Sequence, residues 1–314
     1  MVSLDLPDHT RLRRIVNKAF TPRQVEGLRP RIEAIVDGLL ERVDGRFELM
    51  ESLARPLPVE VICEMLAVPA GDRQFIRACS AELTYLFELV TSVERRQTGL
   101  RGWVALTTYF EELSVERSAK PGDDLLSMLL VVEEAGDRLT RSEVVSMANL
   151  LLFAGHDTTI NLIGNGVLAL LQHPNELARL REDPGIVGSA VEELLRFDSP
   201  VQFVSRVTKT DLDIGNRHLR PHDVVLLCLG AANRDPDQFA DPDRLDLGRA
   251  DNRHVAFGGG PHFCLGTPLA RIEGAVLVSR LFDRFPRLGL AGEPRWRDTS
   301  TIRGLSTLPL AAEG

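Results

Sequence analysis

The sequence lacks the features that mark several classes of protein. No run of about 18 apolar residues occurs, so no membrane-spanning helix is expected. The net charge of −8 argues against a nucleic-acid-binding protein, because such proteins concentrate positive charge. The four cysteines are scattered and form neither a disulfide framework nor the close spacing of zinc ligands. The N-terminus lacks an apolar signal segment, so the cytoplasm is the expected compartment.

The 314 residues also lack any obvious internal division. No Pro/Gly/Ser-rich linker, charge block, internal repeat or low-complexity tract occurs, so residues 1–314 are expected to form a single domain. No G-x-G-x-x-G sequence follows a candidate strand, which argues against a nicotinamide- or flavin-binding domain within the chain. Hydrophobic residues make up 44% and charged residues 26%, which is typical of a globular protein.

Apolar periodicity predicts a mainly α protein with a small β portion. Thr140-Arg-Ser-Glu143 is a capping box that opens a helix continuing to Leu171, before His173-Pro174. A helix of about 30 residues would extend about 45 Å and cross the whole molecule. Further helices are expected within residues 22–43, 54–66 and 72–118 (two helices, the first with Tyr85–Phe87), and short strands at 201–208, 213–214, 224–227 and near the C-terminus.

Residues 257–266 read Phe-Gly-Gly-Gly-Pro-His-Phe-Cys-Leu-Gly and lead into a predicted helix. A cysteine beside a helix N-terminus faces unpaired N–H groups and the positive end of the helix dipole, which favour the thiolate. The glycines allow the backbone to approach a ligand closely. The alternative, a buried cysteine acting as a small hydrophobic residue, suits Cys63, Cys79 and Cys228. It does not suit Cys264, because the surrounding glycines weaken packing.

Three further motifs accompany this loop, in the order Ala154-Gly-His-Asp-Thr-Thr159, Glu193-Leu-Leu-Arg196 and Phe239-Ala-Asp-Pro-Asp-Arg244. Together the four motifs resemble the cytochrome P-450 family of haem-thiolate monooxygenases, and the soluble bacterial members most of all. The resemblance covers essentially the whole chain. Residues 1–14 resemble the third major helix of the family and its approach. The resemblance therefore implies a cytochrome P-450 fold that lacks its first helices and most of its main β-sheet, an N-terminally incomplete domain.

The resemblance also implies haem b (iron protoporphyrin IX) as cofactor, with Cys264 as the axial iron ligand. Ala154 and Gly155 would line a groove beside the haem where dioxygen fits. The remaining cofactor-binding residues that the resemblance implies are the cysteine-loop residues Phe257, Gly258 and Gly266, with His9, Arg13, Arg206 and His262 as partners of the propionates.

Asp157 and Thr158 are the catalytic residues that the resemblance implies, because they would deliver protons to the iron-bound oxygen. The hydroxyl of Thr159 would point away from the iron, and His156 would line the distal side without a ligand role. The alternative for this motif is a tolerated kink in a core helix, because a mid-helix glycine and β-branched threonines weaken a helix.

Glu193 and Arg196 are spaced to share a helix face. Such a pair on a surface contributes only about 0–1 kcal/mol. The resemblance instead implies a buried structural pair that meets Arg244 and ties the cysteine-side segment to the helix.

The implied activity is the insertion of one oxygen atom of O2 into an apolar small molecule by a monomeric enzyme. Electrons would come from a ferredoxin or flavodoxin with its NAD(P)H reductase, and the cations Arg11, Arg14 and Lys18 are expected to be solvated and available to an acidic partner. Residues 85–87 and 201–204 indicate an apolar ligand. The alternatives are oxidative coupling, desaturation or peroxide-driven oxidation, and a non-catalytic haem-binding fragment.

Overall fold

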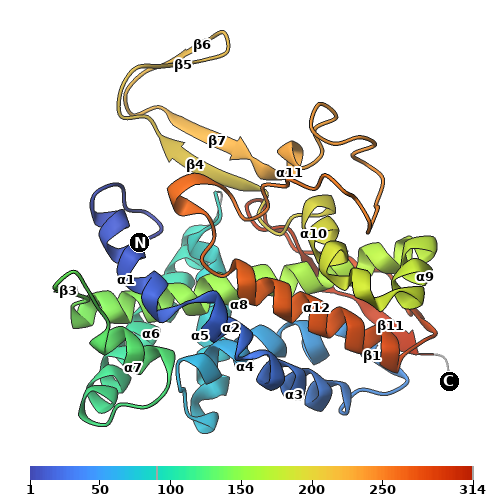
Figure 1. Ribbon diagram of the computed structural model, residues 1–314, viewed down its shortest axis with the longest axis horizontal. Coiled ribbons are helices and arrows are strands. Elements are labelled where there is room, and N and C mark those ends of the chain that lie inside the picture. The colour runs from blue at the N-terminus through green and yellow to red at the C-terminus, as the bar shows by residue number, and fades with distance from the viewer. Residues whose placement is uncertain (90, 313–314) are drawn as a thin grey trace.

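Helices account for most of the chain, as the apolar periodicity predicts, and small sheets account for the strands (Figure 1). The computed structural model describes residues 1–89 and 91–312. The α-helices are α1 (Asp8–Ala19), α2 (Pro22–Glu26), α3 (Arg29–Leu40), α4 (Pro56–Met65), α5 (Arg73–Leu83), α6 (Val93–Ala119), α7 (Leu125–Val131), α8 (Arg141–Gln172), α9 (Pro174–Glu182), α10 (Val187–Phe197), α11 (Leu229–Ala232) and α12 (Thr267–Arg284).

The strands form small antiparallel sheets. A three-stranded sheet has the order β1-β11-β8, and four two-stranded sheets pair β2 with β3, β4 with β7, β5 with β6, and β9 with β10. The strands are β1 (Arg46–Glu48), β2 (Glu133–Glu134), β3 (Asp137–Arg138), β4 (Phe203–Val207), β5 (Leu212–Ile214), β6 (Arg217–Leu219), β7 (Val224–Cys228), β8 (Leu288–Leu290), β9 (Arg295–Trp296), β10 (Leu305–Thr307) and β11 (Pro309–Ala312).

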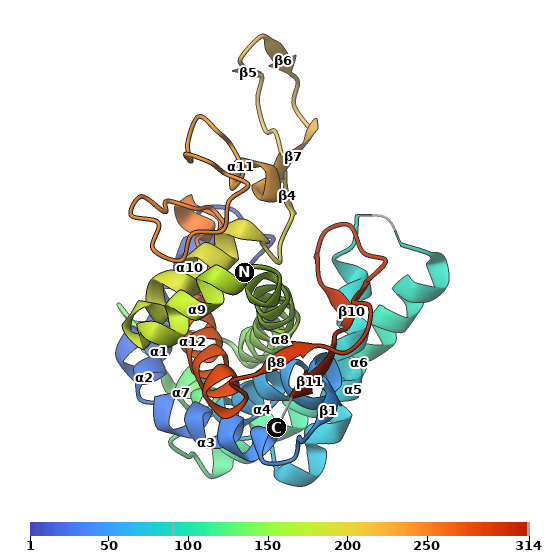
Figure 2. The ribbon, with the colours of Figure 1, turned by 90° about the vertical axis from the view of Figure 1, so that its right-hand side faces the viewer.

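Helix α8 is the central element of the fold, and its predicted start is confirmed. The Thr140 N–H donates to Glu143 Oε2 at 2.7 Å, and the Glu143 N–H donates to Thr140 Oγ1 at 3.3 Å, so the capping box is complete. The helix then runs for 32 residues and packs against α4, α6, α10 and α12. Figure 2 views it nearly end-on, with α9, α10 and α12 on one side and α5 and α6 on the other.

Three local expectations differ from the structure. The helical period over 22–43 is divided between α2 and α3, because Pro30 lacks an N–H group and is accommodated in the first turn of a new helix. Helix α5 ends at Leu83, so residues 85–87 lie in and after a 3₁₀ turn. Cys63 and Cys79 are buried as expected, but the prediction for Cys228 is wrong: it is exposed at the end of β7.

The β4–β7 hairpin projects from the helical body and carries β5 and β6 at its far end (Figures 1 and 2). Apolar side chains on this hairpin are exposed, including Val207 and Val224 at 58% and 66%. Its residues therefore contribute little to the main core, which surrounds α8.

The carboxylate of Glu193 on α10 is fully buried and surrounded by donors. Arg196 donates to it through Nε at 2.8 Å and Nη2 at 2.9 Å, and both side chains are 0% exposed. The Asp246 N–H and the Asn252 side-chain amide add hydrogen bonds of 2.9 and 3.3 Å. A buried charge is tolerated only where such donors replace water.

The second guanidinium in this cluster belongs to Arg249, which the sequence motifs did not indicate. Its Nε lies 3.1 Å from Glu193 Oε2, and its side chain is 10% exposed. Arg244 takes part through its backbone carbonyl, which accepts from Arg196 Nη2 at 3.1 Å, while its own side chain is exposed. The cluster thus joins α10 to the segment that leads toward the cysteine loop.

We expect Arg249→Ala to lower the free energy of unfolding by on the order of 2–3 kcal/mol, because a buried carboxylate loses charge-assisted hydrogen bonds. The matched variant Arg244→Ala keeps the carbonyl that Arg196 uses, so its effect is expected within about 0.5 kcal/mol. Chemical denaturation monitored by circular dichroism measures both. Equal losses in the two variants would contradict this assignment.

Candidate functional site

The cysteine loop presents an exposed thiol just before α12. Gly258 and Gly260 have φ values of 70° and 64°, a left-handed conformation that glycine adopts without strain. The Cys264 N–H donates to the Phe257 carbonyl at 3.0 Å, and the Thr267 hydroxyl donates to the Cys264 carbonyl at 2.9 Å. These bonds fix the backbone on both sides of Cys264 while its side chain remains exposed.

Gly266 is the residue before α12, so Cys264 lies beside the helix N-terminus as the sequence predicts. No atom lies within 4 Å of the positions that a Cβ would take at Gly258, Gly259 or Gly260. Among the described residues, this side of the loop therefore faces open space.

The middle of α8 carries an exposed strip within an otherwise buried helix. Ala154 is exposed, and Leu151 and Thr158 are half-buried. The residues on the other faces of this part of the helix are buried, namely Leu152, Phe153, His156, Asp157, Thr159 and Ile160. Residues 151, 154 and 158 are separated by three and four positions, so they share one face. This strip of small and apolar side chains is a surface that a flat ligand would cover.

Gly155 has a packing role in addition to its predicted place in the groove. A Cβ at Gly155 would lie 2.9 Å from Ile62 Cδ1 of α4, closer than side-chain carbons approach. The glycine therefore allows α4 and α8 to pack closely beside the exposed strip.

Thr158 and Asp157 are held by different kinds of contact. The Thr158 hydroxyl donates to the Ala154 carbonyl at 2.7 Å, the back-bond expected of a threonine within a helix. Asp157 is buried, and its Oδ1 accepts from Arg297 Nη1 at 2.7 Å. Its Oδ2 is buried and finds no hydrogen-bond partner among the described residues. Arg297 is a contact that no local sequence pattern revealed.

The expectation that His156 lines the distal side is wrong. His156 is 3% exposed, and it is two residues from Ala154, a spacing that places side chains on different helix faces. Burial lowers the pKa of His156 to about 4, so the ring is neutral at physiological pH. Thr159 is also buried and away from the exposed strip.

Two of the predicted propionate partners meet directly. The rings of His9 and His262 have centroids 4.1 Å apart, and His9 is 3% exposed with an unpaired Nδ1 among the described residues. Arg13 is half-buried, and this burial lowers its pKa. Arg206, by contrast, is exposed on β4 and donates to the adjacent Ser205 carbonyl.

Among the other cations of α1, Arg14 and Lys18 are exposed as expected, whereas the expectation is wrong for Arg11, which is half-buried. Arg11 donates to Asp137 at 2.6 Å and to Glu143 at 2.6 Å. Arg14 and Lys18 both pair with Glu134. The carboxylates come from the β2–β3 hairpin and the start of α8, so these charges stabilise the fold locally and are already neutralised.

A second carboxylate on α10 braces the cysteine loop. Glu192 accepts from Arg271 Nε and Nη2 at 2.6 and 2.7 Å and lies 3.1 Å from His254 Nε2. The Arg271 guanidinium also lies over the Phe257 ring at 5.3 Å. The sequence analysis missed this group, although the adjacent pair Glu192-Glu193 at a helix face was a visible signal.

These residues fit a haem. Cys264 supplies an exposed sulfur ligand, and His9, His262 and Arg13 supply donors suited to carboxylates, one of them with a buried unpaired nitrogen. The exposed strip on α8 and the open side of the glycine loop offer surfaces for a flat macrocycle. The described residues contain no group of three or more His, Cys, Asp or Glu side chains that could hold a metal ion by themselves.

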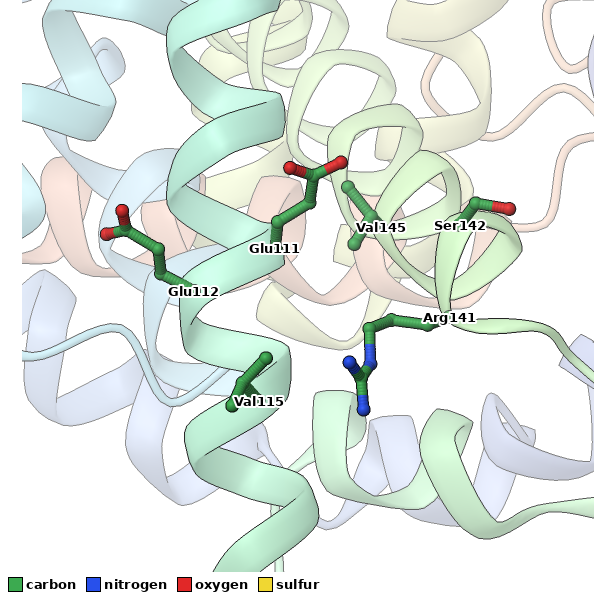
Figure 3. A pocket seen from close by; sticks show the side chains of 6 residues that line it. All are labelled: Glu111, Glu112, Val115, Arg141, Ser142 and Val145. Carbon is green, nitrogen blue, oxygen red and sulfur yellow. The ribbon is translucent and has the colours of Figure 1, made fainter.

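A separate groove of about 460 Å³ lies between α6 and α8 (Figure 3). Figure 3 shows Glu111 and Val115 of α6 facing Arg141 and Val145 of α8. Ala154 lies nine residues beyond Val145 along α8, about two and a half turns or 14 Å from the nearer end of the groove. This groove is therefore distinct from the exposed strip.

Comparison with known proteins decides the family. The family model described as Cytochrome P450 matches residues 105–189 and 185–290. The chain belongs to the cytochrome P450 family. This P450 is 46% identical over 316 residues to cytochrome P450 107B1 of Saccharopolyspora erythraea, covering 99% of the chain and 76% of that protein. It is 47% identical to the vitamin D(3) 25-hydroxylase of Pseudonocardia autotrophica, covering 99% of the chain and 77% of that protein.

Comparison of the structures places the chain in the same family. The crystal structure of P450BioI in complex with hexadec-9Z-enoic acid ligated acyl carrier protein superposes with a TM-score of 0.95 at 42% identity, covering 100% of this chain and 82% of that chain. The chain is thus a P450 monooxygenase with the mainly helical P450 fold. Within the residues that the structure describes, no helix has the length and hydropathy needed to cross a membrane.

The brace at Glu192 predicts an acid-sensitive stability. Burial alone would raise the pKa of Glu192, but the hydrogen bonds from His254 and Arg271 outweigh it and hold the pKa at about 2. An acid with a lowered folded pKa stabilises the protein above its unfolded pKa, here 4.5, and this stabilisation is lost as the pH falls toward 2. We expect Glu192→Gln to be less stable above pH 4.5 and to lose less stability below it. Urea midpoints measured across this range test the expectation.

The control for that experiment is Glu182→Gln on the exposed end of α9, which should leave the fall in the urea midpoint below pH 4.5 unchanged. If the urea midpoint fell equally below pH 4.5 in the wild type and in Glu192→Gln, the bonds of Glu192 would not contribute to the pH dependence of stability.

Proposed function

We propose that this P450 inserts one atom of O2 into an apolar small molecule, with electrons supplied by a ferredoxin or flavodoxin and its NAD(P)H reductase. The observation that carries the proposal is the exposed Cys264 thiol, held in a glycine loop at the N-terminus of α12. By their printed names, one relative is a vitamin D(3) hydroxylase and another binds an acyl carrier protein ligated to hexadec-9Z-enoic acid. Both names describe largely hydrocarbon molecules, which supports an apolar substrate here.

Cys264 is proposed as the axial ligand of a haem b. Cys264 lies two residues before Gly266, the N-cap of α12, and therefore beside the positive end of the helix dipole. A thiolate-ligated haem supplies the electron donation that favours cleavage of the O–O bond. His9, Arg13, His262 and Arg206 are proposed to hold the two propionates, which would pair the Nδ1 of His9.

The exposed strip of α8 is proposed to form the distal wall. Ala154 and Gly155 would leave room for dioxygen beside a bound haem, because neither carries a large side chain. The Thr158 hydroxyl donates its one proton to the Ala154 carbonyl in this structure. It is proposed to turn from that carbonyl and donate its hydrogen bond to the reacting oxygen instead. Asp157 Oδ2, which is unpaired among the described residues, is proposed to return a proton toward Thr158.

Apolar contacts for the substrate are proposed from residues 85–87 and 201–204. Phe87 stacks on Phe153 of α8 with ring centroids 3.8 Å apart. Residues 201–204 lead from α10 into β4 and are half-buried. The apolar side chains of both segments support a hydrophobic substrate.

Replacing the proposed ligand tests the haem assignment. We expect Cys264→Ser to abolish the red-shifted Soret band that the reduced, carbon-monoxide-bound protein shows when a thiolate binds the iron. Cys228→Ser is a matched control, because Cys228 is also exposed but lies in β7. Absorbance spectra of both variants decide the question, and an unchanged band in Cys264→Ser would exclude this cysteine as the ligand.

The proposed proton delivery is tested at neighbouring threonines. We expect Thr158→Ala to bind haem normally but to release reducing equivalents as peroxide, so that product formed per NAD(P)H falls by roughly tenfold or more. Thr159→Ala should be much milder, because Thr159 is buried away from the strip. Peroxide and product are quantified together. Full coupling in Thr158→Ala would remove this hydroxyl from the mechanism.

A further inference from the structure

Residues 297–304, which join β9 to β10 and are called the strap below, connect three distant parts of the chain. Figure 2 shows this red loop beside the chain that links α5 to α6, at the edge of α8. The strap contacts α8, residues 88–89 and residues 200–202. None of these contacts is required by the proposed haem site itself.

The strap is fitted closely against α8. Arg297 Nη1 lies 2.7 Å from Asp157 Oδ1, and the two side chains are only 19% and 7% exposed. One turn farther along the same face, a Cβ at Gly304 would overlap the side chain of Asn161. Only glycine at 304 therefore lets the strap lie this close, and this contact places Arg297 opposite Asp157.

The tip of the strap is held by a buried carboxylate from the α5–α6 link. Glu88 Oε2 accepts from the Ser300 N–H at 2.7 Å, the Ser300 hydroxyl at 3.0 Å and the Thr301 N–H at 3.1 Å. The Leu89 N–H donates back to Thr301 Oγ1 at 3.1 Å. Glu88 is 8% exposed, so its charge depends on these donors.

The residue before Glu88 packs against α8. Phe87 stacks nearly parallel on Phe153, at an interplanar angle of 13°, and Phe153 precedes Ala154 of the exposed strip. A molecule that displaces Phe87 therefore acts on the backbone that carries Glu88.

The base of the strap is anchored separately. The Arg303 guanidinium lies 3.8 Å from the centre of the Trp296 ring, and its Nε donates to Asp198 Oδ1 at 2.8 Å. Ile302 bridges to Val201. Between this base and Arg297 the segment has no helix or strand, so its order depends on hydrogen bonds. Besides the bonds to Glu88 and Asp157, the Gln202 N–H donates to the Thr301 carbonyl at 2.8 Å, and the Thr299 hydroxyl donates to the Ile302 carbonyl at 2.6 Å.

We propose that Glu88 and Arg297 are positioning residues that close the strap as one cooperative unit, so that the α5–α6 link and the Asp157 carboxylate are set together. Seating of Glu88 orders the strap, and the ordered strap holds Arg297 against Asp157. Displacement of Phe87 would loosen both ends. The consequence for turnover rests on the proposed role of Asp157, whereas the coupling itself does not.

The test is whether a substitution at one end of the strap changes amide hydrogen exchange at the other end. Arg297→Lys should increase hydrogen exchange of the Ser300, Thr301 and Leu89 amides roughly tenfold, because a charge-assisted bond is lost at the opposite end. Glu88→Gln should likewise increase exchange of the Arg297 amide, which donates to the Gly304 carbonyl at 2.9 Å. Mass spectrometry with peptide resolution measures both effects on the full chain.

The matched controls are Arg295→Lys on β9 and Glu94→Gln at the start of α6, both exposed, and neither should alter exchange in the strap. If each variant changed exchange only at its own end, the strap would not be a unit and the proposal would be overturned.

A second measurement separates this inference from the proposed function. In the haem-loaded protein, Glu88→Gln and Arg297→Lys should both lower product per NAD(P)H while the thiolate Soret band is retained. If each variant changed hydrogen exchange at the opposite end of the strap but left product per NAD(P)H unchanged, the cooperative strap would be supported and the role of Asp157 rejected. Loss of the Soret band in Cys228→Ser but not in Cys264→Ser would reject the haem assignment and leave the exchange result standing.

Discussion

The burial of Glu193 in α10 is the constraint on which the cysteine side of the molecule depends. A carboxylate with no access to water must find its donors within the protein, and Glu193 takes them from Arg196, Arg249 and nearby amides. Arg196 lies on the same helix, whereas Arg249 and the amides lie on the segment before the cysteine loop, which has little regular structure of its own. The adjacent Glu192 holds the loop and α12 in the same way. A loop that must present Cys264 at a fixed place is thus positioned from one helix by two neighbouring charges.

The features that the sequence predicted well are those encoded over a few neighbouring residues. The capping box of Thr140 and Glu143, the course of α8 and the cysteine loop are set by spacing within one or two turns. The partners of buried charges could not be predicted in this way. Arg249 lies 56 positions from Glu193, and Arg297 lies 140 positions from Asp157, so only the tertiary fold brings them together. The family resemblance supplied the roles of individual residues, but it gave neither of these contacts.

Exposure was the other property that local pattern failed to predict. Arg11 looked solvated because an amphipathic helix places charges on its outer face, yet Asp137 of a two-stranded hairpin distant in sequence pairs with it and leaves it half-buried. Cys228 looked buried because its strand is apolar, but β4 and β7 form a projecting two-stranded ribbon whose faces are not both covered by the core. Burial depends on which elements meet, and the hydropathy of one segment does not determine it.

The chemistry of the bonds at Glu88 bears on how this enzyme can diverge. Two of its three donors are backbone N–H groups, which every residue except proline provides, so positions 300 and 301 are free to change without loss of the attachment. The attachment demands a particular side chain at Glu88, whereas Ser300 and Thr301 each add one side-chain bond to it. The sequence at the tip of the strap can therefore change while most of the bonds that order it are kept. Evolution of new substrate preferences would require few compensating changes on this side of the molecule.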